Sequence, residues 1–120
     1  MSAFDQLTHE EQLHRLQLLA TKSLSNFDLP SESQAVLINL SENATYKVEE
    51  PISGKRWALR VHREGYHTKL AIASELAWLT ALREDGAVIT PKPIFGKDGE
   101  QIQTVTHNEL STPRNVVLFD

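Results

Sequence analysis

Three consecutive segments with the composition of β-strands, separated only by short turns, constrain the fold of this chain more than any other feature of its sequence. They cover residues 34–40, 44–50 and 55–63, and the middle segment alternates polar residues with Tyr46 and Val48. Alternation with a period of two is typical of a strand that buries one face. Because short turns join antiparallel neighbours, the sequence predicts a three-stranded meander.

A long amphipathic segment follows the meander and predicts a helix over residues 68–84. Thr68 can cap its N-terminus, and Gly86 stands where a left-handed residue commonly ends a helix. Small and apolar residues recur at a spacing of three and four, as on the buried stripe of a helix. The stripe expected to pack on the sheet consists of Leu70, Ala71, Ser74, Ala77, Trp78, Ala81 and Leu82.

The remaining segments complete an α+β domain. Residues 94–106 have the pattern of a hairpin with a glycine-containing turn, and residues 115–119 that of a buried strand. Near the N-terminus, Thr8 and Glu11 have the spacing of a capping box. We therefore expect a helical extension over residues 1–29 that covers a sheet edge. Residues 30–120 should form a five-stranded antiparallel sheet with one helix packed on it.

Composition excludes several classes of function. The 120 residues contain no cysteine, so disulfides, thiolate catalysis and zinc–thiolate sites are impossible. A net charge of −4 argues against a nucleic-acid binder. The longest strictly apolar run has four residues, too short to span a membrane. The five histidines lack the spacing of metal ligands. We expect a cytoplasmic protein without nucleic-acid or membrane partners.

Several sequence strings resemble one known family. "SENATYKV", "RWALRVHREGYH" and "IASELAWLTALREDG", followed by Pro91-Lys-Pro93, are similar to the N-terminal lobe of the aminoglycoside phosphotransferase family and its relatives, the choline kinases and type II homoserine kinases. The resemblance covers essentially the whole chain and implies a protein-kinase-like N-terminal lobe. It also implies that the full-length protein uses ATP with Mg²⁺ and phosphorylates a hydroxyl of a small-molecule acceptor.

Two charged residues are the central candidates for nucleotide binding. Strand alternation places Arg60 on the same face as Ala58, and the resemblance implies a phosphate-binding cation and a small residue that admits adenine at these positions. Glu75 would be the acidic partner of Arg60, because a carboxylate beside an apolar helix stripe is costly unless it is paired. The alternatives are a strand arginine that faces solvent and a surface glutamate.

Four further residues complete the candidate set through the resemblance. Ser41, Asn43 and Val48 occupy the place of the glycine-rich loop of protein kinases, although its glycines are absent, and this favours the small-molecule branch. A plain hairpin turn is the alternative for residues 41–43. Leu118 belongs to the strand that would run into the adenine-binding hinge.

The family's second-lobe motifs do not occur in the sequence. No His-Gly-Asp catalytic loop or metal-binding Asp of that kind is present. We therefore expect that the natural polypeptide continues, and that these residues have no catalytic site, are inactive alone and bind ATP only weakly. An apolar inter-lobe face around Leu118 and Phe119 would favour a homodimer. The alternative function is a non-catalytic α+β interaction module with the shape of a kinase lobe.

Overall fold

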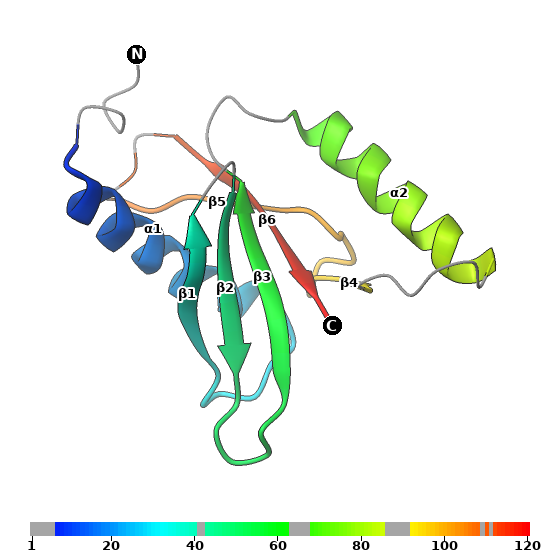
Figure 1. The fold of residues 1–120 in the computed structure, drawn as a ribbon, viewed down its shortest axis with the longest axis horizontal. Helices are drawn as coiled ribbons and strands as arrows, with labels where there is room; N and C mark the ends of the chain where they lie inside the picture. The colour runs from blue at the N-terminus through cyan, green and yellow to red at the C-terminus, as the bar shows by residue number, and fades with distance from the viewer. Residues whose placement is uncertain (1–6, 41–42, 63–67, 86–91, 109, 111) are drawn as a thin grey trace.

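The computed structural model describes residues 7–40, 43–62, 68–85, 92–108, 110 and 112–120 (Figure 1). In chain order its elements are α1 (His9–Ser23), the 3-10 helix η2 (Leu24–Asn26), β1 (Gln34–Leu40), β2 (Asn43–Glu49), β3 (Arg56–His62), α2 (Lys69–Asp85), β4 (Pro93–Ile94), β5 (Gln103–Val105) and β6 (Arg114–Phe119). Of these, no helix combines the length and apolar character needed to cross a bilayer.

One antiparallel sheet organises the described residues. Its strands follow the order β1-β2-β3-β6-β4, and β5 also pairs with β6. The predicted meander of β1, β2 and β3 is confirmed. The sheet has six strands rather than the expected five. The expected hairpin pairing between β4 and β5 is not formed. Instead β5 pairs with the first half of β6 and β4 with its last two residues.

Helix α1 covers one face of the sheet, which we call the α1 face. Thr8 caps the helix, and its hydroxyl accepts a hydrogen bond from the Glu11 amide at 3.2 Å, which is the Thr8 half of the predicted capping box. Leu16, Leu19 and Ala20 are fully buried against strand residues. The expectation that this helix covers a sheet edge is therefore wrong, because its apolar residues share the main core with the inward side chains of the strands.

Helix α2 packs on the opposite face, which we call the α2 face, and it does so with a different stripe from the one expected. Leu70 and Trp78 are 78% and 65% exposed, whereas Ile72 and Leu76 are each 1% exposed. The sheet residues of this second cluster include Val117. The expected stripe also contained large apolar residues, so the spacing along the helix did not decide which side packs on the sheet. Ile72 and Leu76 pack because they meet Ile102, Val117 and Phe119 in the second cluster. The side chain of Leu82 lies outside the described residues.

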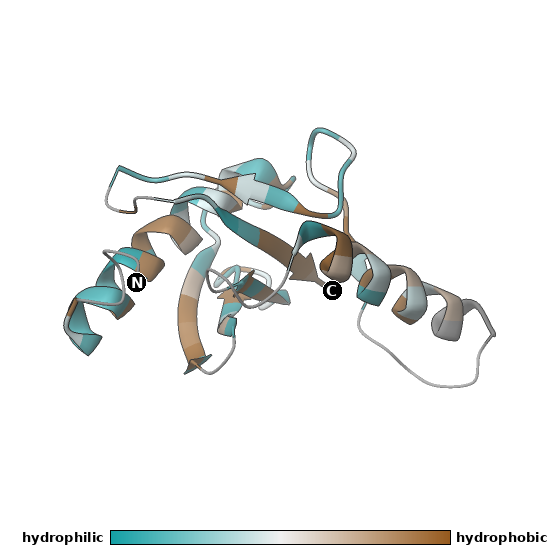
Figure 2. Ribbon diagram, turned by 90° about the horizontal axis from the view of Figure 1, so that it is seen from above, coloured by the Kyte–Doolittle hydropathy of each residue, from teal (hydrophilic) through white to brown (hydrophobic). Residues whose placement is uncertain are grey.

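The two helices thus lie on different faces of one sheet. Figure 2 shows them on either side of hydrophobic strand segments. Because the α1 face carries the larger cluster, α1 and the meander form the main body of the core. Helix α2 adds a smaller cluster near β6.

Two leucines on α2 provide a matched test of this packing. Leu76→Ala removes a buried side chain and should lower the free energy of unfolding by about 2–5 kcal/mol. Leu70→Ala removes an exposed one and should change it by less than about 0.5 kcal/mol. Urea unfolding followed by circular dichroism measures both values. Equal losses in the two variants would contradict the orientation of α2.

The buried Tyr46 on β2 should make the fold less stable at alkaline pH. Its side chain is 1% exposed, and its hydroxyl has no hydrogen-bond partner within the part of the chain described here. Burial raises the pKa of this phenol well above its usual value. The unfolded chain therefore releases the phenolic proton first as the pH rises through about 10, so unfolding becomes more favourable above that pH.

Tyr46→Phe should remove this dependence. At neutral pH the variant should be as stable as the natural chain or more stable, because a buried hydroxyl without a partner is lost. Above about pH 10 the natural chain should lose up to about 1.4 kcal/mol of stability per pH unit more than the variant. Urea titrations at several pH values measure this difference. If the stability of the natural chain and of Tyr46→Phe changed equally with pH, the phenol would have the same pKa in the folded and unfolded chain, and the prediction would be wrong.

Candidate functional site

Among the described residues, the α2 face is partly exposed over β1, β2 and β3, whereas its β6 part is buried under α2. Strand register places Val36, Lys47, Ala58 and Phe119 opposite one another in a row across β1, β2, β3 and β6. Val36 is 53% exposed, and Ala58 is exposed although it lies on a central strand. An antiparallel sheet can leave part of one face open to solvent. This row is therefore a platform with space above its smallest residue.

Arg60 lies one step further along the same face. Its direct neighbours across the strands are Thr45 on β2 and Val117 on β6. The guanidinium Nη1 donates to the Glu75 Oε1 at 3.1 Å, with the two side chains 27% and 46% exposed. The pairing of these two residues on one side of the sheet is as predicted.

The position of Glu75 follows from the packing of α2. Thr68 caps the helix by accepting a hydrogen bond from the Ala71 amide at 3.1 Å. Ile72 and Leu76 then fix the helix against the sheet, and Glu75 lies beside them, three residues after the first and one before the second. Residues three apart share one face of a helix, so Glu75 lies on the same side as Ile72. Burial of two aliphatic side chains thus holds the carboxylate next to β3.

Phe119 is a part of the site that the sequence reasoning missed. The Arg60 Cζ lies 5.0 Å from the centroid of its ring, within the range of a cation–π interaction. Phe119 is also the strand partner of Ala58, and it is 4% exposed within the cluster that holds α2. The ring therefore touches both the cation and the helix. The register between β3 and β6 places Phe119 beside Ala58 and near Arg60, and the sequence alone does not give this register.

The other residues predicted to bind the nucleotide differ in their distance from Arg60 in the fold. Ser41 lies outside the described residues. Asn43 begins β2 opposite His62, and its Oδ1 is buried without a partner within the described residues. Val48 and Leu118 have their side chains on the α1 face, fully buried in the main core. The structure therefore groups Ala58, Arg60 and Glu75, places Asn43 at the end of the same face, and separates Val48 and Leu118.

The apolar face expected around Leu118 and Phe119 is absent from the described surface. The two side chains are 0% and 4% exposed, so they offer no patch for a second copy of the chain. Both are covered because β4 pairs alongside them and the two helices occupy both faces of β6.

The donors on the α2 face suit phosphate oxygens. Arg60 presents a planar fork of N–H groups, and Lys47 adds an ammonium on the neighbouring row. One Arg60 nitrogen bonds Glu75, which leaves other donors of the guanidinium available. By contrast, the described residues contain no group of three metal-ligating side chains, so no residue of this part is assigned to Mg²⁺.

An antiparallel sheet whose central strand carries a cation, paired with a carboxylate from one helix, defines the N-terminal lobe of a protein-kinase-like phosphotransferase. The sequence model of the phosphotransferase enzyme family (APH) matches residues 35–107. The match includes more than half of the chain, and this chain belongs to that family.

The solved structure of a microcompartment-associated aminopropanol kinase is similar to this chain. The two share 41% sequence identity with a TM-score of 0.76, over 86% of this chain and 30% of that one. The chain thus spans less than a third of the length of this relative. No curated protein matches the chain.

Proposed function

We propose that these residues form the nucleotide-covering lobe of a cytoplasmic, ATP-dependent kinase for small molecules, in which Arg60 contacts the phosphates of ATP. The observation that carries the proposal is the contact between Arg60 and Glu75 beside the exposed Ala58. A cation that is already held in place needs little reorganisation when an anion binds.

The spacing of the two rows supports a particular arrangement of the nucleotide. Adenine would lie over Ala58, against the apolar carbons of its row, and the phosphates would lie toward Arg60. Residues two apart on a strand are separated by roughly 7 Å, which leaves room for the ribose between base and phosphates. Asn43 lies on the same face as Thr45, the strand partner of Arg60, and two residues nearer the start of β2.

The chemistry assigned to this lobe is positioning and charge neutralisation. In phosphoryl transfer, the terminal phosphoryl group of ATP moves to an acceptor hydroxyl, and ADP and a proton are released. We assign Arg60 no proton-transfer step. Its role is to hold phosphate oxygens through paired N–H donors. Glu75 acts as a positioning residue through Arg60.

The acceptor we propose is a small amino alcohol. The 41% identity to an aminopropanol kinase supports this class. The residues described here contain the proposed nucleotide side only. We therefore infer that these 120 residues catalyse no transfer to aminopropanol by themselves.

Arg60→Ala tests the phosphate contact. Loss of a charge-assisted hydrogen bond costs about 1.5–3 kcal/mol, so ATP affinity should fall about tenfold or more. Amide shifts in ¹H–¹⁵N spectra of the 120-residue chain, titrated with ATP, measure the binding. Glu75→Ala should weaken binding less, because the cation remains.

Arg56→Ala is the matched control. Arg56 lies on the same strand and face and pairs with Glu49 at 2.7 Å, on the far side of Ala58 from Arg60. Its removal also leaves a glutamate without its partner, and it should change ATP affinity less than twofold. An unchanged affinity in Arg60→Ala, or equal losses in both variants, would refute the specific role of Arg60.

Ala58→Leu tests the place of the base. The larger side chain would fill the space above the row, so nucleotide binding should fall at least tenfold. The free energy of unfolding should change by less than about 0.5 kcal/mol, because position 58 is exposed. Ala77→Leu on α2, also at an exposed position, is the control and should leave both quantities unchanged. Full ATP binding by Ala58→Leu would exclude this position for adenine.

A further inference from the structure

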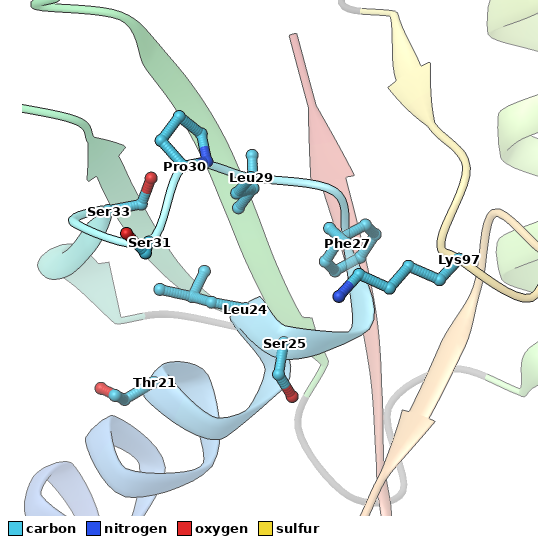
Figure 3. A pocket seen from close by; sticks show the side chains of 9 residues that line it. All are labelled: Thr21, Leu24, Ser25, Phe27, Leu29, Pro30, Ser31, Ser33 and Lys97. Atoms are coloured by element: carbon cyan, nitrogen blue, oxygen red, sulfur yellow. The ribbon is translucent and has the colours of Figure 1, made fainter.

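A pocket of about 420 Å³ lies away from the Arg60 site, beside the end of α1. The residues that line it come from the last turn of α1, from η2 and the segment that follows, and from the turn after β4 (Figure 3). They are Thr21, Leu24, Ser25, Phe27, Leu29, Pro30, Ser31, Ser33 and Lys97. The volume lies within the range of about 300–1,000 Å³ that small-molecule sites occupy.

The pocket belongs to the α1 side of the molecule. Phe27 is fully buried in the main core, and Leu24 and Leu29 pack against the same cluster. Arg60 and Glu75 lie on the α2 face instead. A ligand in this pocket would therefore be separated from the proposed nucleotide by the sheet.

The polar groups of the pocket include one buried hydroxyl without a hydrogen-bond partner among the described residues. The Ser33 hydroxyl is buried and has no partner within the described residues. The Thr21 hydroxyl, by contrast, accepts a hydrogen bond from the Gln17 side-chain amide at 3.3 Å on the helix surface. A buried polar group without a partner is costly, and a native structure commonly provides one through water or a ligand.

Lys97 is the one charged residue among those that line the pocket, and the lining contains no carboxylate. Within the described residues its ammonium forms no ion pair. The neighbouring Asp98 carboxylate instead accepts hydrogen bonds from the Gln103 side chain and the Glu100 amide, both of which lower its pKa. The charge of the lining is therefore positive.

The end of α1 does not require Lys97 as a cap. The carbonyl oxygens of Thr21 and Lys22 accept from the Leu24 amide, and the Leu24 carbonyl accepts from the Phe27 amide. The Asn26 carbonyl accepts from the backbone amide of Lys97 at 2.8 Å. These bonds leave the ammonium of Lys97 available for another acceptor. Figure 3 shows it across the pocket from Ser31 and Ser33, with Leu24 and Leu29 between.

We propose that this pocket binds a small organic anion with an apolar body. Its carboxylate or phosphate monoester would pair with Lys97, and its carbon chain would contact Leu24 and Leu29. An acceptor atom at the far end of the ligand would accept a hydrogen bond from the Ser33 hydroxyl. Such a ligand would connect α1 with the turn between β4 and β5.

Binding of pentanoate to the 120-residue chain tests the proposal. Amide shifts in ¹H–¹⁵N spectra should saturate and should concentrate at the pocket residues. Pentanamide, which has the same body without charge, should bind at least tenfold more weakly. A parallel titration with propyl phosphate compares the two head groups. The anion that binds more tightly shows whether the pocket prefers a carboxylate or a phosphate monoester. Absence of saturable shifts with both anions, or equal binding of pentanamide, would overturn the proposal.

Two variants separate binding from folding. Lys97→Gln should weaken pentanoate binding about tenfold or more, whereas Lys55→Gln, in the exposed turn before β3, should leave it unchanged. Ser33→Ala should leave the melting temperature unchanged or raise it, because it removes a buried hydroxyl without a partner, and yet weaken binding severalfold. A Lys97→Gln chain that binds like the natural one would refute the site, as would unchanged pentanoate affinity in Ser33→Ala.

Discussion

The contact between Arg60 and Glu75 depends on how α2 packs against β6. Burial of Ile72 and Leu76 holds the helix on the sheet, and this places the carboxylate within reach of the guanidinium. Because both charged side chains are partly exposed, the ion pair itself adds at most about 1 kcal/mol to stability. Its consequence is geometric. The apolar contact supplies the free energy, and the ion pair fixes the direction of a cation toward the open part of the sheet.

Phe119 connects the apolar packing of α2 with the position of the Arg60 guanidinium. The same ring packs in the α2 cluster and lies 5.0 Å from the Arg60 Cζ. An arginine suits this position better than a lysine would, because a flat guanidinium can stack on a ring and still present N–H groups at its edge. The site thus uses three elements, β3, α2 and β6, that are distant in sequence and adjacent in the fold.

Local patterns in the sequence predicted which segments form helices and strands better than they predicted the contacts between these elements. The meander, the two long helices with their threonine caps, and the pairing of Arg60 with Glu75 could be predicted from alternation, capping and the family resemblance. The rotation of α2 could not, because several apolar stripes compete on that helix and only the sheet decides between Leu70 and Leu76. Phe119 was missed for a similar reason. Alternation gives the face of a residue within its own strand, whereas register between distant strands depends on the whole sheet.

The pairing of β6 has a consequence for the order in which the sheet can form. This strand joins β3 on one side and both β4 and β5 on the other, although it comes last along the chain. During synthesis the meander and α1 can associate early through contacts that are near in sequence. The edge of β3 must stay open until β6 has emerged, because its partner is separated from it by the entire α2 segment. Such long-range pairing slows folding and leaves an unpaired edge exposed to other chains in the interval.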